Sequence, residues 1–360
     1  MSGDRDPLGT LAAAEIERGA MPGAAWWVGN ADGAVAFGCR GNAAVEPAPD
    51  PLRVETPFDL ASLTKPFVTA LLATILDREG RMTLDAPLGS VFAELASSPF
   101  ARATLRDAAA HRAGFPPWIP LGMSGTTRDS YLARIAACER RGSPGETLYS
   151  DLGYILLGFA VEDAEGSPLD RVFDRRIAGP LGLRRCGFPG RGAAFADAAA
   201  TERGGYYERD LAGAEARPDR FRATIRRGEV HDGNCWALGG VAGHAGLFAP
   251  AAAVAALAQA LLAPQRLGLP EGSLDPMFCP VLDRPHARTI GFLRAGDAES
   301  VSGLLPDDAV GHSGFTGTSV WIDATRPRIY VLLTNRVHPT VPTKPFTATR
   351  RAFHALAAAL

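Results

Sequence analysis

Lysine is almost absent from this chain of 360 residues. Among its 37 basic residues, Lys65 and Lys344 are the two lysines, and all the others are arginines. A genome rich in G and C explains such a bias without any functional cause. Each lysine still stands out, because arginine keeps its proton near neutral pH whereas a buried lysine can lose it. A position that needs a deprotonatable amine therefore cannot use arginine instead.

Other features are missing too, and each absence excludes a class of protein. The five cysteines are scattered without a C-x-x-C pair: Cys39, Cys138, Cys186, Cys235 and Cys279. This spacing predicts neither a disulfide framework nor a zinc knuckle. The net charge is −2 with no basic excess, which argues against a nucleic-acid partner. The apolar run from Ala251 to Ala263 is too short to span a membrane.

The start of the chain carries Asp4, Arg5 and Asp6 where a secretory signal would have a basic and then an apolar stretch. We therefore expect a soluble, cytoplasmic protein with reduced thiols. We expect no metal, no cofactor and no membrane partner. The sequence leaves the oligomeric state open.

Strand patterns lie at both ends of the chain, and helical patterns lie between them. Apolar spacing predicts helices over Leu8–Arg18, Phe67–Glu79, Ala251–Leu262 and Thr347–Leu360. Alternating and β-branched runs predict strands over Ala24–Val28, Ala34–Phe37, Thr289–Leu293, Thr318–Ile322 and Ile329–Leu333. The stretch from Asn42 to Thr56 reads as a loop because it is rich in proline.

The two ends can share one sheet only if the middle of the chain is an insertion. We expect an α+β fold in which residues 1–60 and 286–360 form an antiparallel sheet flanked by the N- and C-terminal helices. Residues 61–285 form an inserted, mainly helical domain. A site between the two domains is then expected, since ligands commonly bind at such interfaces.

The first motif with chemical content is Ser62-Leu63-Thr64-Lys65. On a helical turn, residues three apart share a face, which places the Ser62 hydroxyl beside the Lys65 amine. Serine needs a nearby base to act as a nucleophile. A buried lysine with a lowered pKa is neutral and can be that base. The alternative is a capping serine beside a surface lysine.

A second segment runs from Pro144 to Tyr154 and contains Tyr149-Ser150-Asp151. Beside a cationic lysine, a tyrosine can pass a proton between a serine and a leaving group. The alternative is an ordinary buried tyrosine followed by a helix N-cap at Asp151.

A third segment, Gly311 to Gly317, contains His312-Ser313-Gly314 before an apolar strand. Small residues on an edge strand let a substrate backbone approach, and a main-chain N–H there can serve an oxyanion. The alternative is a glycine-rich turn. The segment is not a G-x-S-x-G elbow, because Phe315 occupies the last glycine position.

The order of these motifs resembles that of the serine β-lactamase and penicillin-binding-protein superfamily, particularly its class C-like branch of D,D-peptidases and esterases. Residues 58–65 resemble the segment around the family's nucleophile, and 111–114 its His-Thr-Ser-Gly turn. Residues 149–154 resemble its Tyr-x-Asn element, and 312–314 its Lys-Thr-Gly strand in the His-Ser-Gly form.

The resemblance implies a role for each matching residue. Ser62 would be acylated, Lys65 would be the general base and Tyr149 would share the proton transfers. The main-chain N–H groups of Ser62 and Phe315 would form the oxyanion hole. The other implied substrate contacts are Asp151, His312, Ser313 and Gly314.

Three departures from the family pattern qualify these roles. Asp151 replaces an amide with a carboxylate, which should hold Lys65 more cationic and leave more work to Tyr149. His312 replaces a permanent cation, which should weaken recognition of a substrate carboxylate and make it pH-dependent. Pro66 disfavours regular helix beside Lys65, so the turn at Ser62 should be 3₁₀-like.

A glycine-dense segment, 228–248, contains His231, Asp232 and His244. Its second half resembles the family's Ala-Gly-Gly-Leu turn. We expect its two histidines to line the substrate pocket; a plain turn is the alternative, and metal binding is a third reading that no H-x-x-x-H spacing supports. Trp118, after two prolines, is expected at the rim of the cleft.

These residues together predict a serine hydrolase that forms a covalent acyl-enzyme on small amides or esters. Cell-wall-derived peptides with D-amino acids are the expected substrates. A short-chain carboxylesterase or acyltransferase is one alternative. A non-catalytic penicillin-binding-like module is the other.

Overall fold

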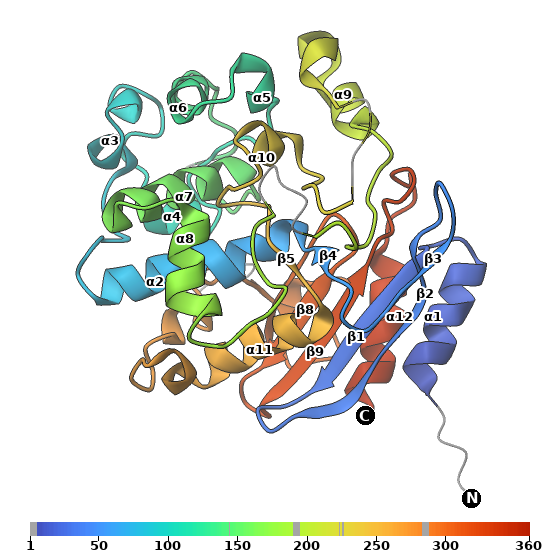
Figure 1. The fold of residues 1–360 in the computed structure, drawn as a ribbon. Helices are drawn as coiled ribbons and strands as arrows, with labels where there is room; N and C mark the ends of the chain where they lie inside the picture. Colours follow the sequence, from blue (N-terminus) through green and yellow to red (C-terminus); the bar gives the residue numbers. More distant parts are fainter. Residues whose placement is uncertain (1–5, 144, 190–194, 223, 225–226, 283–287) are drawn as a thin grey trace, which may run out of the picture.

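The computed structural model describes residues 6–143, 145–189, 195–222, 224, 227–282 and 288–360 (Figure 1). The helices are α1 (Pro7–Glu17), α2 (Leu71–Arg78), α3 (Leu88–Val91), α4 (Leu105–Ala109), α5 (Leu121–Ser124), α6 (Arg128–Ala136), α7 (Asp151–Glu165), α8 (Leu169–Phe173), α9 (Tyr206–Ala212), α10 (Gly233–Ala237), α11 (Ala251–Leu262) and α12 (Thr347–Ala358). The strands are β1 (Gly23–Gly29), β2 (Ala34–Ala44), β3 (Asp50–Pro51), β4 (Phe58–Asp59), β5 (Phe248–Ala249), β6 (Leu293–Arg294), β7 (Val310–Ser313), β8 (Ser319–Asp323) and β9 (Arg328–Thr334). Pro144 and the expected domain boundary at residue 286 lie outside the described residues.

One antiparallel sheet joins the two ends of the chain. Its seven described strands lie in the order β3-β2-β1-β9-β8-β7-β6. β1 pairs with β2 on one side and with β9 on the other, so that Trp27 lies between Phe37 and Val331. The expected α+β fold with an antiparallel sheet is therefore confirmed. The division into domains at residues 60 and 286 stays a prediction.

Both faces of the sheet are covered. Successive residues of its central strands point to opposite faces, and these residues are apolar on both faces. Ala25 and Trp27 of β1 point into the larger core with α11, while Trp26 and Val28 point into a second core with α1 and α12. The helices α1 and α12 lie together on one side of the sheet in Figure 1. The N- and C-terminal helices thus flank the sheet, as expected.

Two local predictions were wrong. β2 continues from Ala34 to Ala44 and pairs with β3, so the expected loop at 42–56 begins with strand. The predicted strand over Thr289–Leu293 is mostly a turn, since Phe292 N donates to Thr289 Oγ1 at 3.2 Å. Gly291, with φ of +97°, adopts a conformation that a β-branched strand residue would avoid. Strand begins only at Leu293.

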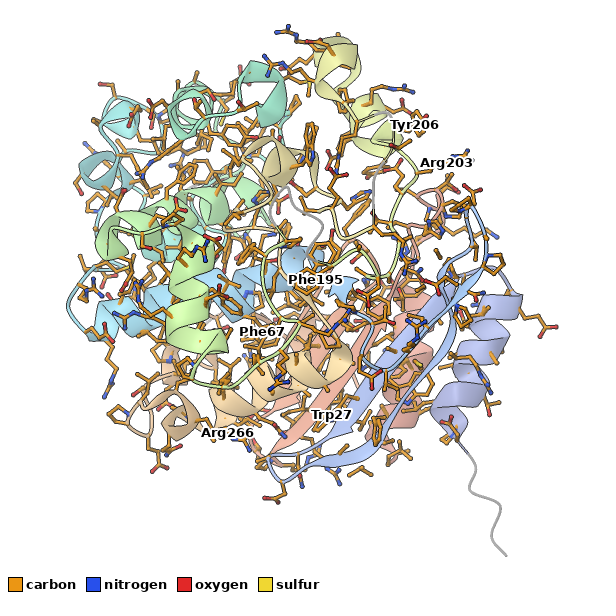
Figure 2. All side chains as sticks on the ribbon, viewed as in Figure 1. Trp27, Phe67, Phe195, Arg203, Tyr206 and Arg266 are labelled. Atoms are coloured by element: carbon orange, nitrogen blue, oxygen red, sulfur yellow. The ribbon has the colours of Figure 1, made fainter. Side chains whose placement is uncertain are left out.

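The larger core continues from the sheet into the helical part of the chain. Trp27 on the sheet and Phe67 ahead of α2 both belong to it (Figure 2). A short two-stranded sheet, β4 with β5, lies between these parts and pairs Asp59 with Phe248. Because β4 directly precedes Ser62, this pairing fixes the position of the serine segment. Within the described ranges, no helix has the length and apolar character needed to cross a membrane.

The close approach of α7 to the glycine-rich turn generates a test of the packing. A Cβ on Gly158 would lie 2.9 Å from Gly243 Cα, which is backbone and cannot rotate away. Gly158→Ala should therefore destabilise the protein by about 1–3 kcal/mol, although the same change in an open helix stabilises it by up to about 1 kcal/mol. Urea unfolding measures the difference. Unchanged or increased stability would show that the turn moves aside.

Candidate active site

Ser62 lies in a short 3₁₀ turn, Ala61–Leu63, as the proline at position 66 predicted. A wide π-helical stretch follows over Lys65–Ala70, and regular α-helix begins only at Leu71. Pro66 has no N–H to give to an α-helical hydrogen bond, which is consistent with the irregular start. The expected helix over 67–79 is therefore confirmed except in its first turn.

Ala61, which precedes Ser62, has a φ of +47°. This left-handed conformation costs a residue other than glycine about 1–3 kcal/mol. Hydrogen bonds on both sides hold it: Asp59 Oδ1 accepts from Ala61 N at 2.8 Å, and Ala61 O accepts from Thr64 Oγ1 at 2.7 Å. Leu247 N donates to the same Thr64 hydroxyl. The strained turn presents Ser62 to the cleft.

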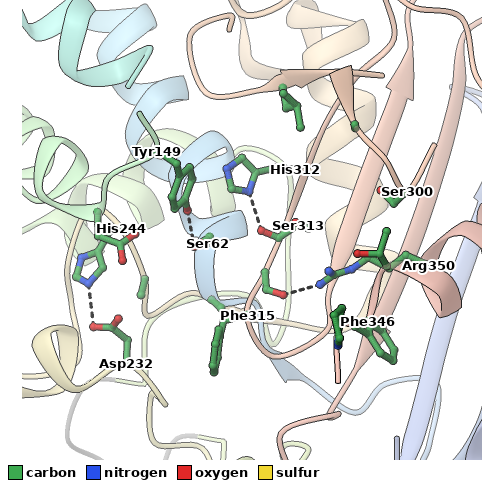
Figure 3. A pocket seen from close by; sticks show the side chains of 18 of the residues that line it. Ser62, Tyr149, Asp232, His244, Ser300, His312, Ser313, Phe315, Phe346 and Arg350 are labelled. Atoms are coloured by element: carbon green, nitrogen blue, oxygen red, sulfur yellow. Dashed lines mark hydrogen bonds and ion pairs between the residues drawn. The ribbon is translucent and has the colours of Figure 1, made fainter. Parts of the chain in front are cut away.

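The Ser62 hydroxyl contacts both predicted proton-transfer groups. Lys65 Nζ donates to Ser62 Oγ at 2.8 Å. The Tyr149 hydroxyl donates to the same oxygen at 2.8 Å (Figure 3). The reading of Ser62 as a simple cap with a surface lysine is wrong, since Lys65 is fully buried. Ser150, not Asp151, accepts from Leu152 N and caps α7.

Lys65 is a cation in this setting, which differs from the neutral amine expected for a buried lysine. Its Nζ lies 2.7 Å from Asp151 Oδ1 and donates to His244 O at 3.1 Å. Burial alone would lower its pKa, but the Asp151 carboxylate, with a smaller contribution from Tyr149, outweighs burial and raises the pKa. The effect is the one expected from a carboxylate in place of the family's amide.

Tyr149 is a neutral phenol surrounded by rings and cations. Burial raises its pKa, and the Lys65 ammonium opposes that rise. The His111 ring packs at 4.4 Å from the Tyr149 ring, while Lys65 Nζ and the Arg288 guanidinium lie 5.1 and 5.3 Å from its centre. Cations over an aromatic face stabilise extra negative charge on it. The environment is therefore suited to a phenol whose oxygen gains charge during a reaction.

Arg288 is a site residue that sequence reasoning missed. It lines the cleft, yet nothing in the sequence separated it from the many other arginines. Burial lowers the pKa of His312, as do the charges of Arg288 and Lys65, so the imidazole is neutral. The permanent cation that His312 cannot supply is therefore present nearby as Arg288.

The strand element β7 lies where the sequence placed it, with one difference. The two residues of β6 pair with the first half of β7, Leu293 with Gly311 and Arg294 with Val310. β7 is therefore an edge strand only in its second half. His312 and Ser313 lie beyond those pairs and line the cleft. The His312 ring is held by its Nδ1, 2.8 Å from Ser313 O.

The turn after β7 is tied to the segment before Ser62. Thr316 Oγ1 donates to Asp59 O at 2.8 Å, and Thr318 Oγ1 donates to Leu60 O at 3.1 Å. A Cβ on Gly314 would lie 2.6 Å from Leu60 O, so only glycine allows this approach. The contacts place Phe315 and Ser62 at the same cleft. The oxyanion hole formed by their main-chain N–H groups stays a prediction.

A cleft of about 650 Å³ brings these residues together. Apart from Lys65, which lies behind Ser62, every residue that the sequence singled out lines it: Ser62, Trp118, Tyr149, Asp151, His231, His244, His312, Ser313, Gly314 and Phe315. Residues from widely separated parts of the chain therefore form one site.

One end of the cleft carries a buried polar network from the 200–244 region. His231 Nε2 lies 2.9 Å from Glu202 Oε2, and His244 Nε2 lies 2.8 Å from Asp232 Oδ1. Burial and the Asp232 charge raise the pKa of the nearby Glu208 to about 7. In the part of the chain that the structure describes, no group of three or more His, Cys, Asp or Glu residues is arranged to hold a metal ion.

Fold and site together define a serine hydrolase with a serine–lysine–tyrosine arrangement. The chain belongs to the β-lactamase family, since the model of that family matches residues 10–353. A relative from Escherichia coli O157:H7, provisionally named a D-alanyl-D-alanine carboxypeptidase, is 32% identical over 309 residues, covering 79% of this chain and 70% of the relative.

Solved structures share the fold. EstCE1, a hydrolase with promiscuous acyltransferase activity, superposes with a TM-score of 0.75 at 20% identity and covers 97% of both chains. A class C β-lactamase from Rhodobacter sphaeroides superposes with a TM-score of 0.73 at 18% identity and covers 99% of both chains. These similarities extend over nearly the whole chain.

The raised pKa of Glu208 predicts a pH-dependent stability. Its folded pKa of about 7 exceeds the ordinary 4.5, so the folded state takes up a proton that the unfolded state does not hold. This stabilisation is complete below about pH 4.5 and is lost as the pH rises through 7. Replacing Glu208 by Gln should therefore stabilise the protein more at pH 8 than at pH 5, by on the order of 1–3 kcal/mol.

Urea unfolding at both pH values measures this difference. Glu299→Gln is the control, since Glu299 is an exposed carboxylate that lines the same cleft. An equal effect of Glu208→Gln at the two pH values would show that Glu208 titrates normally.

Proposed function

We propose that this protein forms a covalent acyl-enzyme at Ser62 and hydrolyses small amides, with short peptides that contain D-amino acids as its substrates. The observation that carries the proposal is the pair of 2.8 Å hydrogen bonds from Lys65 and Tyr149 to one serine oxygen. The relative named for D-alanyl-D-alanine cleavage supports the choice of peptide.

In the proposed acylation, Ser62 Oγ bonds to the substrate carbonyl carbon. The serine proton passes to Lys65 as Lys65 passes its own proton to Asp151 along the 2.7 Å contact. Lys65 remains an ammonium and Asp151 becomes neutral, so the pair gains one positive charge, which offsets the negative charge that forms on the substrate oxygen. As the carbon–nitrogen bond breaks, Tyr149 protonates the leaving nitrogen, and the proton held by Asp151 returns through Lys65 to Tyr149.

The developing oxyanion is assigned to the main-chain N–H groups of Ser62 and Phe315. Loss of one such donor typically costs about 3–4 kcal/mol of transition-state stabilisation. Water then attacks the acyl-enzyme, with Tyr149 and Lys65 returning the protons. His312, Ser313 and Gly314 orient the substrate along β7, with Trp118 at the rim.

A second candidate activity is the hydrolysis or transfer of short acyl esters. Neutral His312 offers no permanent charge for a substrate carboxylate, and an ester leaving group needs none. EstCE1, with its acyltransferase activity, shares the fold. Comparison of p-nitrophenyl acetate with D-alanyl-D-alanine peptides separates the two activities.

Intact-mass measurement after exposure to a fluorophosphonate tests the nucleophile. We expect a single adduct on the wild-type chain and none on Ser62→Ala, because the other candidate groups are not activated alcohols. Lys65→Arg should react nearly as slowly as Lys65→Ala, since arginine cannot accept the proton. An adduct that persists on the folded Ser62→Ala variant would move the nucleophile elsewhere and favour a different site.

Asp151→Asn tests the control of Lys65. Asp151 raises the pKa of Lys65, whereas burial lowers it, so removal of the carboxylate should lower that pKa. The rise in the fluorophosphonate labelling rate that accompanies deprotonation of Lys65 should then occur at lower pH than in the wild type. The rate constant for fluorophosphonate labelling is measured from pH 5 to 10, with Glu299→Gln as the control. An unchanged pH profile of the labelling rate would show that the rate does not depend on the titration of Lys65.

A further inference from the structure

The end of the cleft beside Asp232 combines aromatic rings with carboxylates. The Tyr207 ring of α9 lies 5.0 Å from the Phe315 ring, and the His231 ring stacks on Phe315 at 5.5 Å. Tyr207 and Phe315 are 42% and 37% exposed. Exposed aromatic faces beside negative charge are the usual surroundings of a bound organic cation.

Glu208 supplies negative charge that no side chain among the described residues neutralises directly. Both of its carboxylate oxygens accept from Gly233 N, at 3.0 and 2.8 Å. Among the described residues, no cationic side chain forms an ion pair with it. Burial raises its pKa, and the negative charge of the neighbouring Asp232 raises it further.

The basic side chains that face this end are already engaged. His231 is paired with Glu202, and His244 contacts Asp232. The Arg222 guanidinium donates to Val230 O and His231 O and lies over the Trp236 ring. The charges of His231 and Arg222 reduce the negative field around Glu208 without an ion pair to its carboxylate.

An independent observation also points to a ligand. His244 lines the cleft and is 1% exposed, and its Nδ1 has no hydrogen-bond partner in the described structure. Because Asp232 Oδ1 can only accept, it takes the proton that Nε2 carries. Nδ1 is then a buried polar atom of the kind that is normally satisfied by water or by a ligand.

The position of these groups indicates which part of a substrate they meet. In Figure 3, His244 and Asp232 lie on one side of Ser62, while Ser313, Arg350 and Phe346 lie on the other. In the acylation proposed above, the leaving group lies at Tyr149, which protonates it, and continues along the end of β7. The acyl part then extends to the opposite side, toward Asp232 and α9.

We propose that this end of the cleft binds a protonated amine carried by the acyl part of the substrate, with Glu208 and Asp232 as its ion-pair partners. The proposal rests on the acyl-enzyme function above. It narrows the substrate class to amides or esters of amino acids, or of peptides, whose amine is free. The aromatic rings of Tyr207 and Phe315 cover the amine from the solvent side.

Calorimetric titration tests the binding without requiring turnover. D-Alanine amide carries an ammonium where isobutyramide carries a methyl group of similar size. At pH 8 we expect D-alanine amide to bind the wild-type protein at least tenfold more tightly than isobutyramide. Glu208→Gln should remove most of this preference, Glu208→Asp should keep part of it, and Glu299→Gln should keep all of it. Equal binding of the two amides, or a preference unchanged in Glu208→Gln, would overturn the proposal.

Turnover distinguishes failure of this inference from failure of the proposed function. The p-nitroanilides of D-alanine and of isobutyric acid should differ in kcat/KM in the same direction as the two amides differ in affinity. The preference of the wild type should fall below pH 7, whereas the small preference that remains in Glu208→Gln should not fall in this way. An ammonium preference in binding with no Ser62 adduct would keep the amine site and reject the acyl-enzyme. A Ser62 adduct with equal binding of the two amides would do the reverse.

Discussion

The contact between Lys65 and Asp151 is the interaction on which the rest of the site depends. A fully buried ammonium is tolerated only because a carboxylate lies 2.7 Å away and the His244 carbonyl accepts a second hydrogen bond. With the ammonium in place, its remaining hydrogen bond reaches Ser62, and its charge lies against the Tyr149 ring. The serine, the phenol and the glycine-rich turn at Gly243–His244 are thus arranged around one buried charge pair.

The sequence predicted the parts of the fold that follow from local periodicity. The helices at both ends, the β1–β2 hairpin and the strands β8 and β9 have strong apolar patterns, and each formed near its expected position. The strand expected at Thr289–Leu293 failed because a β-rich composition was outweighed by Gly291 and by the Thr289 hydroxyl, which close a turn. The hydrophobic pattern of a short segment does not show whether strand propensity or turn formation will prevail.

The candidate site likewise contains some residues that the sequence identified and others that it did not. Ser62, Lys65 and Tyr149 were identifiable because the order of their motifs resembles that of a known family, and the structure brings them into contact. Arg288 and Glu208 were not identifiable, since an arginine in a loop and a glutamate on a short helix resemble surface residues. Their importance comes from burial and from charges on distant segments, such as Asp232 beside Glu208. The charge state of Lys65 likewise required knowing that Asp151 lies within contact distance.

The neighbouring position of β1 and β9 has a consequence for the synthesis of this protein. β1 lies inside the sheet and requires, along one edge, hydrogen bonds from β9, which is made only after the whole intervening helical part. On the ribosome, the β1–β2 hairpin therefore emerges with one unpaired edge that persists until β9 has been made. Such exposed edges are prone to association with other chains, and the long-range pairing makes closure slow. The nascent chain is thus more vulnerable to aggregation before β9 emerges than after it.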